Sequence, residues 1–142
     1  MMIDVRQGDL YMIENQLTRV FYIDSAYVFV VGMDEYFIEK FDSNLFLRDV
    51  NMGIYQKQAD MSSGSQPHLT EQDVQKITAY ANVLDNILDE LYPAWEEIAK
   101  PRYKKPYLRK AAASLNLHYK HISRLMKRYL RSGRDKYALI DG

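Results

Sequence analysis

Basic side chains that repeat at helical spacing near the end of the chain are the residues best suited to chemistry. At about 100 degrees per residue, four of them share one stripe: Lys120, Arg124, Lys127 and Arg131. Apolar residues take the opposite side of the same predicted helix: Ile122, Leu125 and Tyr129. Such a stripe suits the phosphates and base edges of a DNA major groove, although the solvated face of an ordinary helical hairpin would carry the same charges.

The predicted DNA contacts fall into two groups. Base contacts are expected from the stripe and from three neighbouring residues: Lys120, Arg124 and Lys127, then Tyr119, His121 and Ser123. Phosphate contacts are expected from cations at either end of the motif: Arg102, Lys104, Lys105, Arg128 and Arg131. Lys127, Arg128 and Arg131 would also suit the negative end of the helix dipole, which Gly133 is placed to cap.

The residues between Pro101 and Pro106 supply the first of these phosphate-binding cations. Their sequence is RYKK, and we expect a basic segment that leads into the helical motif. Such an arm can lie along the phosphate backbone or reach into a minor groove. An exposed loop without a specific role fits the same residues equally well.

Catalysis is not indicated by the residues that could support it. The chain has no cysteine, which excludes thiolate metal sites and a cysteine nucleophile. Its carboxylates lie on predicted turns and on one helix surface, whereas a two-metal site needs acids that converge from separate elements. His118 and His121 have no acid or nucleophile at a useful spacing, and isolated glycines form no phosphate-binding loop. We therefore predict no catalytic residue, no metal and no cofactor.

The formal net charge of zero hides a strong asymmetry along the chain. Residues 101–142 contain twelve Lys or Arg and two Asp, a net charge of +10, so the first hundred residues carry −10. This division favours a nucleic-acid partner for the C-terminal part, with the acidic part facing away from it. No apolar run approaches the roughly 20 residues of a membrane span, so we expect a cytoplasmic protein without a membrane partner.

A helix-turn-helix is the arrangement expected to position the basic stripe. Ala111, Ala112 and Leu115 recur at helical spacing, and Asn116 stands where the chain must reverse. Asparagine is one of the few residues that tolerate the left-handed conformation of such a turn. The small Ala112, four residues before Asn116, would let the two helices cross closely.

A preceding helix is expected to complete a tri-helical domain over residues 70–142, after a linker at residues 60–69. Thr70 and Asp73 form a capping-box pattern at its start, and Pro93 ends it. The apolar stripe of this helix comprises Val74, Ile77, Ala81, Leu84, Leu88 and Leu91, with acids on its other faces. Trp95 is expected to pack inward rather than to stack on a base.

Residues 1–59 are expected to form a small β-rich module. Short segments rich in Tyr, Phe, Val and Ile predict strands at residues 10–14, 18–23, 26–31, 36–41 and 54–57, with a short helix capped by Ser43 before the last. A small, strongly bent β-barrel would close these strands, and its aromatic residues would fill the core. The predicted fold class is therefore α+β: a barrel-like module followed by an all-helical helix-turn-helix domain.

The order of these parts resembles the N-terminal region of TnsB-type transposases, the DDE strand-transfer subunits of Tn-seven-like transposons. The similar segments are Ile122–Tyr129 (ISRLMKRY), Gly133, Ala138–Ile140 (ALI) and the opening Gly8–Tyr11 (GDLY). The resemblance implies binding to repeated sites at transposon ends, in DNA transposition and integration, with other transposition proteins as possible partners. It also implies that the catalytic acids lie in a separate downstream domain. The apolar run near residue 140, close to the end of the chain, suits a piece of a longer protein.

Two other functions fit the same sequence. A stand-alone transcriptional regulator would use the β-rich module to sense a ligand or partner, and it would share the helix-turn-helix. A protein-interaction adaptor with an incidentally basic tail would bind DNA without preference between sequences. The predicted function is sequence-specific binding of double-stranded DNA at transposon ends, with the regulator as the alternative.

Overall fold

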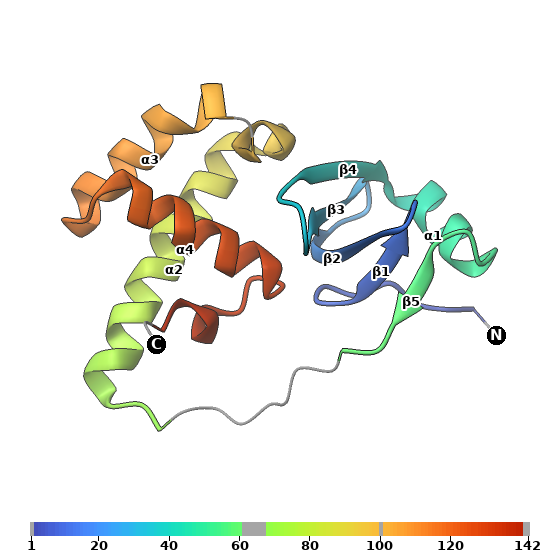
Figure 1. The fold of residues 1–142 in the computed structure, drawn as a ribbon, viewed down its shortest axis with the longest axis horizontal. Coiled ribbons are helices and arrows are strands. Elements are labelled where there is room, and N and C mark those ends of the chain that lie inside the picture. Colours follow the sequence, from blue (N-terminus) through green and yellow to red (C-terminus); the bar gives the residue numbers. More distant parts are fainter. Residues whose placement is uncertain (1, 61–67, 100, 141–142) are drawn as a thin grey trace. The chain divides into compact units, whose positions relative to one another are not determined.

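A computed structural model describes residues 2–60, 68–99 and 101–140 of the 142-residue chain, and for residues 97 and 101–105 it describes the backbone only. The described residues form an α+β structure with one five-stranded antiparallel sheet, four α-helices and two short 3-10 helices (Figure 1). The chain separates into two compact units. The first comprises residues 1–62 with Leu130–Arg134, and the second comprises residues 63–129 with 135–142.

The sheet of the first unit is open, so the predicted barrel is wrong. Its strands are β1 (Leu10–Ile13), β2 (Gln16–Ile23), β3 (Tyr27–Gly32), β4 (Ile38–Asp42) and β5 (Gln56–Gln58). They lie in the order β4-β3-β2-β1-β5, with every neighbouring pair antiparallel. Helix α1 (Ser43–Asn51) runs between the two edge strands in sequence and packs on β3 and β4. Helix α1 covers an apolar face of the sheet. In a barrel, the sheet would instead bury this face by closing on itself.

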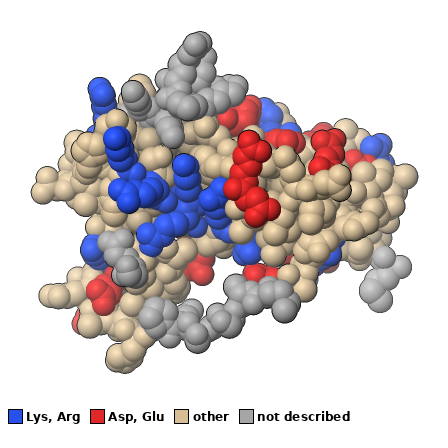
Figure 2. Space-filling view, in the orientation of Figure 1, with Lys and Arg blue, Asp and Glu red and all other residues tan. Residues whose placement is uncertain are grey.

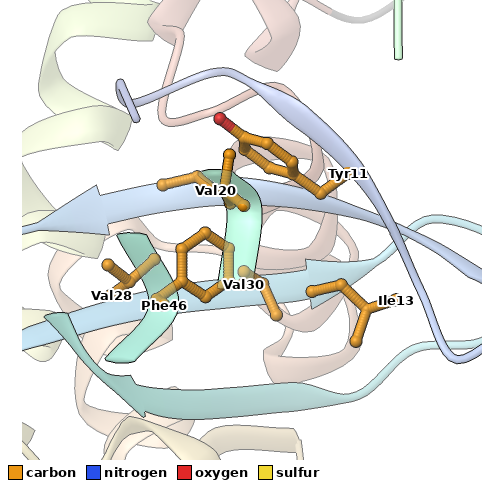
Figure 3. Packing of buried hydrophobic residues seen from close by; sticks show 7 residues of the cluster. Tyr11, Ile13, Val20, Val28, Val30 and Phe46 are labelled. Carbon is orange, nitrogen blue, oxygen red and sulfur yellow. The ribbon is translucent and has the colours of Figure 1, made fainter. Parts of the chain in front are cut away.

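The core of the first unit forms between this sheet face and α1. Alternate residues of β1, β2 and β3 converge with two residues of α1: Tyr11, Ile13, Val20, Val28, Val30, Phe46 and Val50 (Figure 3). The ring centre of Phe46 lies 5.5 Å from that of Tyr11 and 5.2 Å from that of Phe41. The prediction that aromatic residues fill this core is confirmed for Tyr11, which is fully buried in it; Phe21 and Phe29 are also fully buried but do not belong to this cluster.

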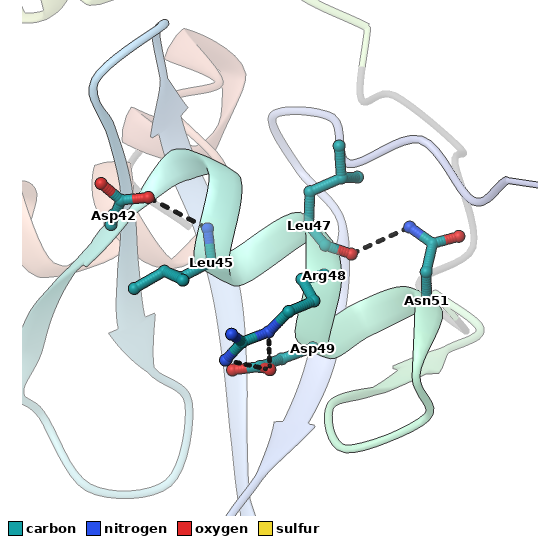
Figure 4. A network of polar contacts seen from close by, with 6 residues as sticks. All are labelled: Asp42, Leu45, Leu47, Arg48, Asp49 and Asn51. Atoms are coloured by element: carbon teal, nitrogen blue, oxygen red, sulfur yellow. Dashed lines mark hydrogen bonds and ion pairs between the residues drawn. The ribbon is translucent and has the colours of Figure 1, made fainter.

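Local chemistry fixes the turns and the start of α1. Glu14 and Asn15, with φ values of 49° and 66°, form the turn between β1 and β2. Strand β1 therefore ends at Ile13, one residue before the predicted end at residue 14. Asp42, and not the predicted Ser43, caps α1: its carboxylate accepts a hydrogen bond from the Leu45 N–H at 3.0 Å (Figure 4). A carboxylate at this position satisfies an amide that has no partner within the helix.

Gly32 ends β3 because its backbone is crowded. A Cβ atom there would lie 2.0 Å from the Glu35 carbonyl oxygen and 2.4 Å from the Phe37 ring. The Gly32 N–H also donates to the Phe37 carbonyl at 2.9 Å, which closes the connection to β4. Glycine is therefore required here for close approach rather than for an unusual φ angle.

The second unit contains α2 (Glu71–Leu91), η1 (Trp95–Ala99), α3 (Pro101–Leu115), most of α4 (Tyr119–Arg131) and η2 (Lys136–Leu139). The predicted capping box is present: the Thr70 side chain accepts from the Asp73 N–H, and the Asp73 carboxylate accepts from the Thr70 N–H. Most of the predicted stripe of α2 is buried, together with two residues that the prediction omitted: Tyr80 and Ile87. Trp95 is also buried, and its indole N–H donates to the Leu88 carbonyl.

The segment between Pro101 and Pro106 is helical, which corrects the expectation of an arm or loop. It forms the first turn and a half of α3, so Pro106 lies inside the helix. Proline at the first helical position is favourable because its missing N–H would have no partner there. At Pro106 the helix lacks one backbone hydrogen bond. None of the helices in the described residues is long and apolar enough to cross a membrane.

Candidate nucleic-acid interface

The junction between α3 and α4 is built around Asn116. This residue has a φ of 56°, the left-handed conformation predicted for it. The Leu117 N–H donates to the Ala112 carbonyl at 2.9 Å, and the Asn116 N–H donates to the Ala113 carbonyl at 3.4 Å. These are the two hydrogen bonds of a Schellman motif, which satisfies the last carbonyls of a helix while the chain reverses. The turn therefore fixes the direction in which α4 begins.

His118 caps the start of α4. Its Nδ1 accepts a hydrogen bond from the Lys120 N–H at 3.2 Å, and its carbonyl accepts from the N–H groups of His121 and Ile122. The imidazole also stacks on the ring of Tyr119, with a centroid separation of 4.7 Å. His118 thus has a structural role at a helix end, where side-chain acceptors serve amides that lack a partner within the helix.

The inner face of α4 is apolar and anchored to α2. Ile122, Leu125 and Tyr129 are buried as expected, together with Met126 and Leu130, which the sequence stripe did not include. The Tyr129 hydroxyl donates to the Asp85 carboxylate at 2.9 Å. This charge-assisted hydrogen bond links α4 to α2 and restricts rotation of α4 about its axis.

The outer face of α4 carries the cations that the sequence singled out. Lys120 and Arg124 are exposed, one turn apart. Four other predicted base-contacting residues are half-buried: Tyr119, His121, Ser123 and Lys127. Lys and Arg side chains gather over α4 on the face shown in Figure 2. The helix thus presents positive charge on the side opposite its buried residues.

Arg128 and Arg131, predicted to bind phosphates, make contacts within the protein. The Arg128 guanidinium donates to the carbonyls of Ala138 and Ile140, at 3.2 Å and 2.6 Å. Arg131 belongs to the first unit, where its Nε donates to the Gly32 carbonyl at 3.0 Å and its guanidinium lies 5.5 Å from the Tyr36 ring centre. Each guanidinium therefore has at least one backbone carbonyl partner within the protein, a structural role that the sequence did not predict.

Arg109 is a cation that sequence reasoning counted in the net charge but did not place in the site. It is exposed on α3, and its guanidinium lies 5.8 Å from the ring centre of Tyr119 at the start of α4. The contact brings a cation of α3 beside the basic end of α4. Spacing within one helix cannot reveal such a pair, because it depends on the angle of the turn at Asn116.

Three predicted phosphate contacts lie outside the described side chains: Arg102, Lys104 and Lys105. Their backbone belongs to the first turns of α3. Among the described residues, no group of three or more His, Asp or Glu side chains could hold a metal ion.

No protein-family model matches the chain, and no curated protein matches it at a significant level. A function must therefore be argued from the geometry of the residues themselves.

Proposed function

We propose that the chain binds double-stranded DNA sequence-specifically, with α3 and α4 acting as a helix-turn-helix and α4 entering the major groove. The observation that carries this proposal is the division of α4 into two faces. Lys120 and Arg124 are exposed, whereas Ile122 and Leu125 on the other side are fully buried. A helix anchored in this way presents cations to phosphates and base edges without exposing its apolar residues.

The contacts at the start of α4 support the same proposal. In a helix-turn-helix, the N-terminal part of the second helix makes most of the contacts to bases. Here that part carries Lys120 and Arg124, and the Tyr119 ring lies close to both the His118 ring and the Arg109 guanidinium. Arg109 thereby adds a cation from α3. We assign Arg124 to base contact, because arginine can bind guanine through two hydrogen bonds, and Arg109 to phosphate contact.

The similarity of the order of parts to TnsB-type transposases suggests the biological context. We propose that the chain recognises repeated sites at transposon ends in the cytoplasm, together with other transposition proteins. The strand-transfer chemistry would reside in a separate catalytic domain, and we assign no catalytic residue to this chain. The sheet and α1 would then serve as an interaction module.

A salt-titrated binding assay tests this function. Fluorescence anisotropy would compare a duplex that carries the terminal repeats of the source transposon with a scrambled duplex of equal length. We expect a preference of about a hundredfold, which corresponds to roughly 3 kcal/mol. A site found only by selection from random duplexes would favour the transcriptional regulator instead, and equal affinity for all duplexes would refute specific recognition.

A matched pair of variants tests the role of α4. Arg124→Gln should reduce discrimination between the preferred and scrambled duplexes by about tenfold, since one bidentate base contact contributes roughly 1–3 kcal/mol. Lys76→Gln removes the same charge from α2, where the ammonium lies 5.7 Å from the Tyr80 ring centre, and should leave discrimination unchanged. An equal loss on both duplexes for Arg124→Gln would remove Arg124 from the base-contacting set.

A further inference from the structure

An open groove lies between α2 and α3, on surfaces that the DNA proposal does not use. Its volume is about 360 Å³, which is within the range of grooves and pockets that bind ligands. Apolar residues from both helices line it, chiefly Val83, Ile87 and Ala111. Two carboxylates of α2, Asp89 and Glu90, stand beside it together with Lys110 of α3.

The groove faces a different direction from the basic side of the unit. At about 100 degrees per residue, Tyr107, Ala111 and Ser114 share one side of α3, and Arg109 lies nearly opposite them. On α2, Val83 and Ile87 are likewise turned away from Asp85, which bonds to Tyr129 of α4. A partner in the groove would therefore leave Lys120, Arg124 and Arg109 accessible.

The charges around the groove select the kind of partner. Asp89 and Glu90 are both exposed. The Lys110 ammonium lies 3.5 Å from a Glu90 carboxylate oxygen, with side chains that are 76% and 53% exposed. An exposed ion pair of this kind contributes little to stability, so an incoming cation can replace Lys110 at Glu90. The groove thus combines an apolar floor with a negatively charged side.

We propose that this groove binds an amphipathic, basic peptide segment of a partner protein. An apolar side chain of the segment fills the space between Val83, Ile87 and Ala111. An adjacent Arg or Lys of the segment pairs with Asp89 and Glu90 and displaces Lys110. The site is independent of DNA binding by α4, so its test can succeed or fail separately.

The test uses the full chain and a short, fluorescently labelled amphipathic peptide of Leu, Ala and Arg. Glu90→Gln should weaken binding of this peptide about fivefold, whereas Lys110→Gln should strengthen it by a similar factor, because loss of Lys110 frees Glu90. Glu71→Gln, at the start of the same helix and outside the groove, is the charge-matched control and should change nothing. The same peptide with every Arg replaced by Gln should bind more weakly to the native chain.

Two further measurements separate the groove from general charge attraction. Ser114→Leu places an apolar side chain at the exposed edge of the groove and should abolish binding without disturbing the helical core. Lys120→Gln with Arg124→Gln should leave peptide affinity unchanged while weakening DNA binding. The proposal is overturned if Glu90→Gln and Glu71→Gln weaken peptide binding equally, if Ser114→Leu has no effect, or if the Gln-substituted peptide binds as well as the original.

Discussion

Replacing Arg128 with Gln distinguishes a structural cation from a DNA-contacting one on the same helix. The sequence places Arg128 beside the basic stripe, but its guanidinium donates to the carbonyls of Ala138 and Ile140. These bonds join the last part of α4 to η2 and the residue after it. We expect Arg128→Gln to destabilise the second unit and to leave the salt dependence of DNA binding unchanged.

The size of the effect follows from the two hydrogen bonds that are lost. A hydrogen bond from a charged donor contributes roughly 1.5–3 kcal/mol when it is buried. Arg128 is only half-buried, so water can reach both the released carbonyls and the side chain that replaces it. We therefore expect a loss of about 1.5 kcal/mol for both bonds together, half or less of the buried value. A phosphate contact, by contrast, would change the slope of log affinity against log salt by about 0.9.

The assay combines urea unfolding with salt-titrated DNA binding. Trp95 is the only tryptophan of the chain and is buried in the second unit, so its fluorescence reports the unfolding of that unit. Arg124→Gln is the matched comparison, because it removes the same charge from an exposed position one turn earlier. The structural assignment of Arg128 is refuted if Arg128→Gln leaves the unfolding free energy unchanged and lowers the salt slope by about 0.9.

Two further predictions concern the backbone and alkaline pH. Asn116→Ala should destabilise the second unit by about 1 kcal/mol in urea unfolding, because alanine tolerates the left-handed turn poorly, whereas Asn116→Gly should be nearly neutral. Burial raises the pKa of Tyr11 above its usual value of 10.0, and the charge of Asp9 and a hydrogen bond to it act in the same direction. The contribution of the neutral Tyr11 hydroxyl to the unfolding free energy is therefore fully present below about pH 10 and is lost as the pH rises further. Tyr11→Phe removes this titrating group, so the unfolding free energy of the variant should fall less steeply at alkaline pH. An unchanged alkaline profile for Tyr11→Phe would contradict this assignment.

Local patterns predicted much of the secondary structure. The Thr70 and Asp73 capping box, the left-handed Asn116 and the apolar stripe of Ile122, Leu125 and Tyr129 follow from residue types and spacing within a few positions, although the stripe omitted the buried Met126 and Leu130. The open sheet could not be predicted in the same way. Closure depends on whether β4 and β5 pair, and α1 instead covers one face while these strands remain at opposite edges.

The roles of individual cations depend on contacts between elements and were therefore harder to predict. Lys120, Arg128 and Arg131 look equivalent in the sequence, since each is a basic residue at helical spacing. Arg128 contacts the residues around η2, and Arg131 contacts the end of β3, whereas Lys120 is exposed. A long basic side chain can satisfy its donors on a distant carbonyl as well as on a phosphate, and only the fold decides which.

Three acids of α2 make contacts within the second unit that do not involve the exposed cations of α4. Asp73 belongs to the capping box, Asp85 accepts from the Tyr129 hydroxyl, and Glu90 pairs with Lys110. Each acts within its own helix or toward a neighbouring helix of the same unit. Since Asp85 bonds to the buried side of α4, its negative charge helps to orient the helix while the cations on the opposite side remain exposed. These acids therefore contribute to the packing of the helices and leave the outer face of α4 basic.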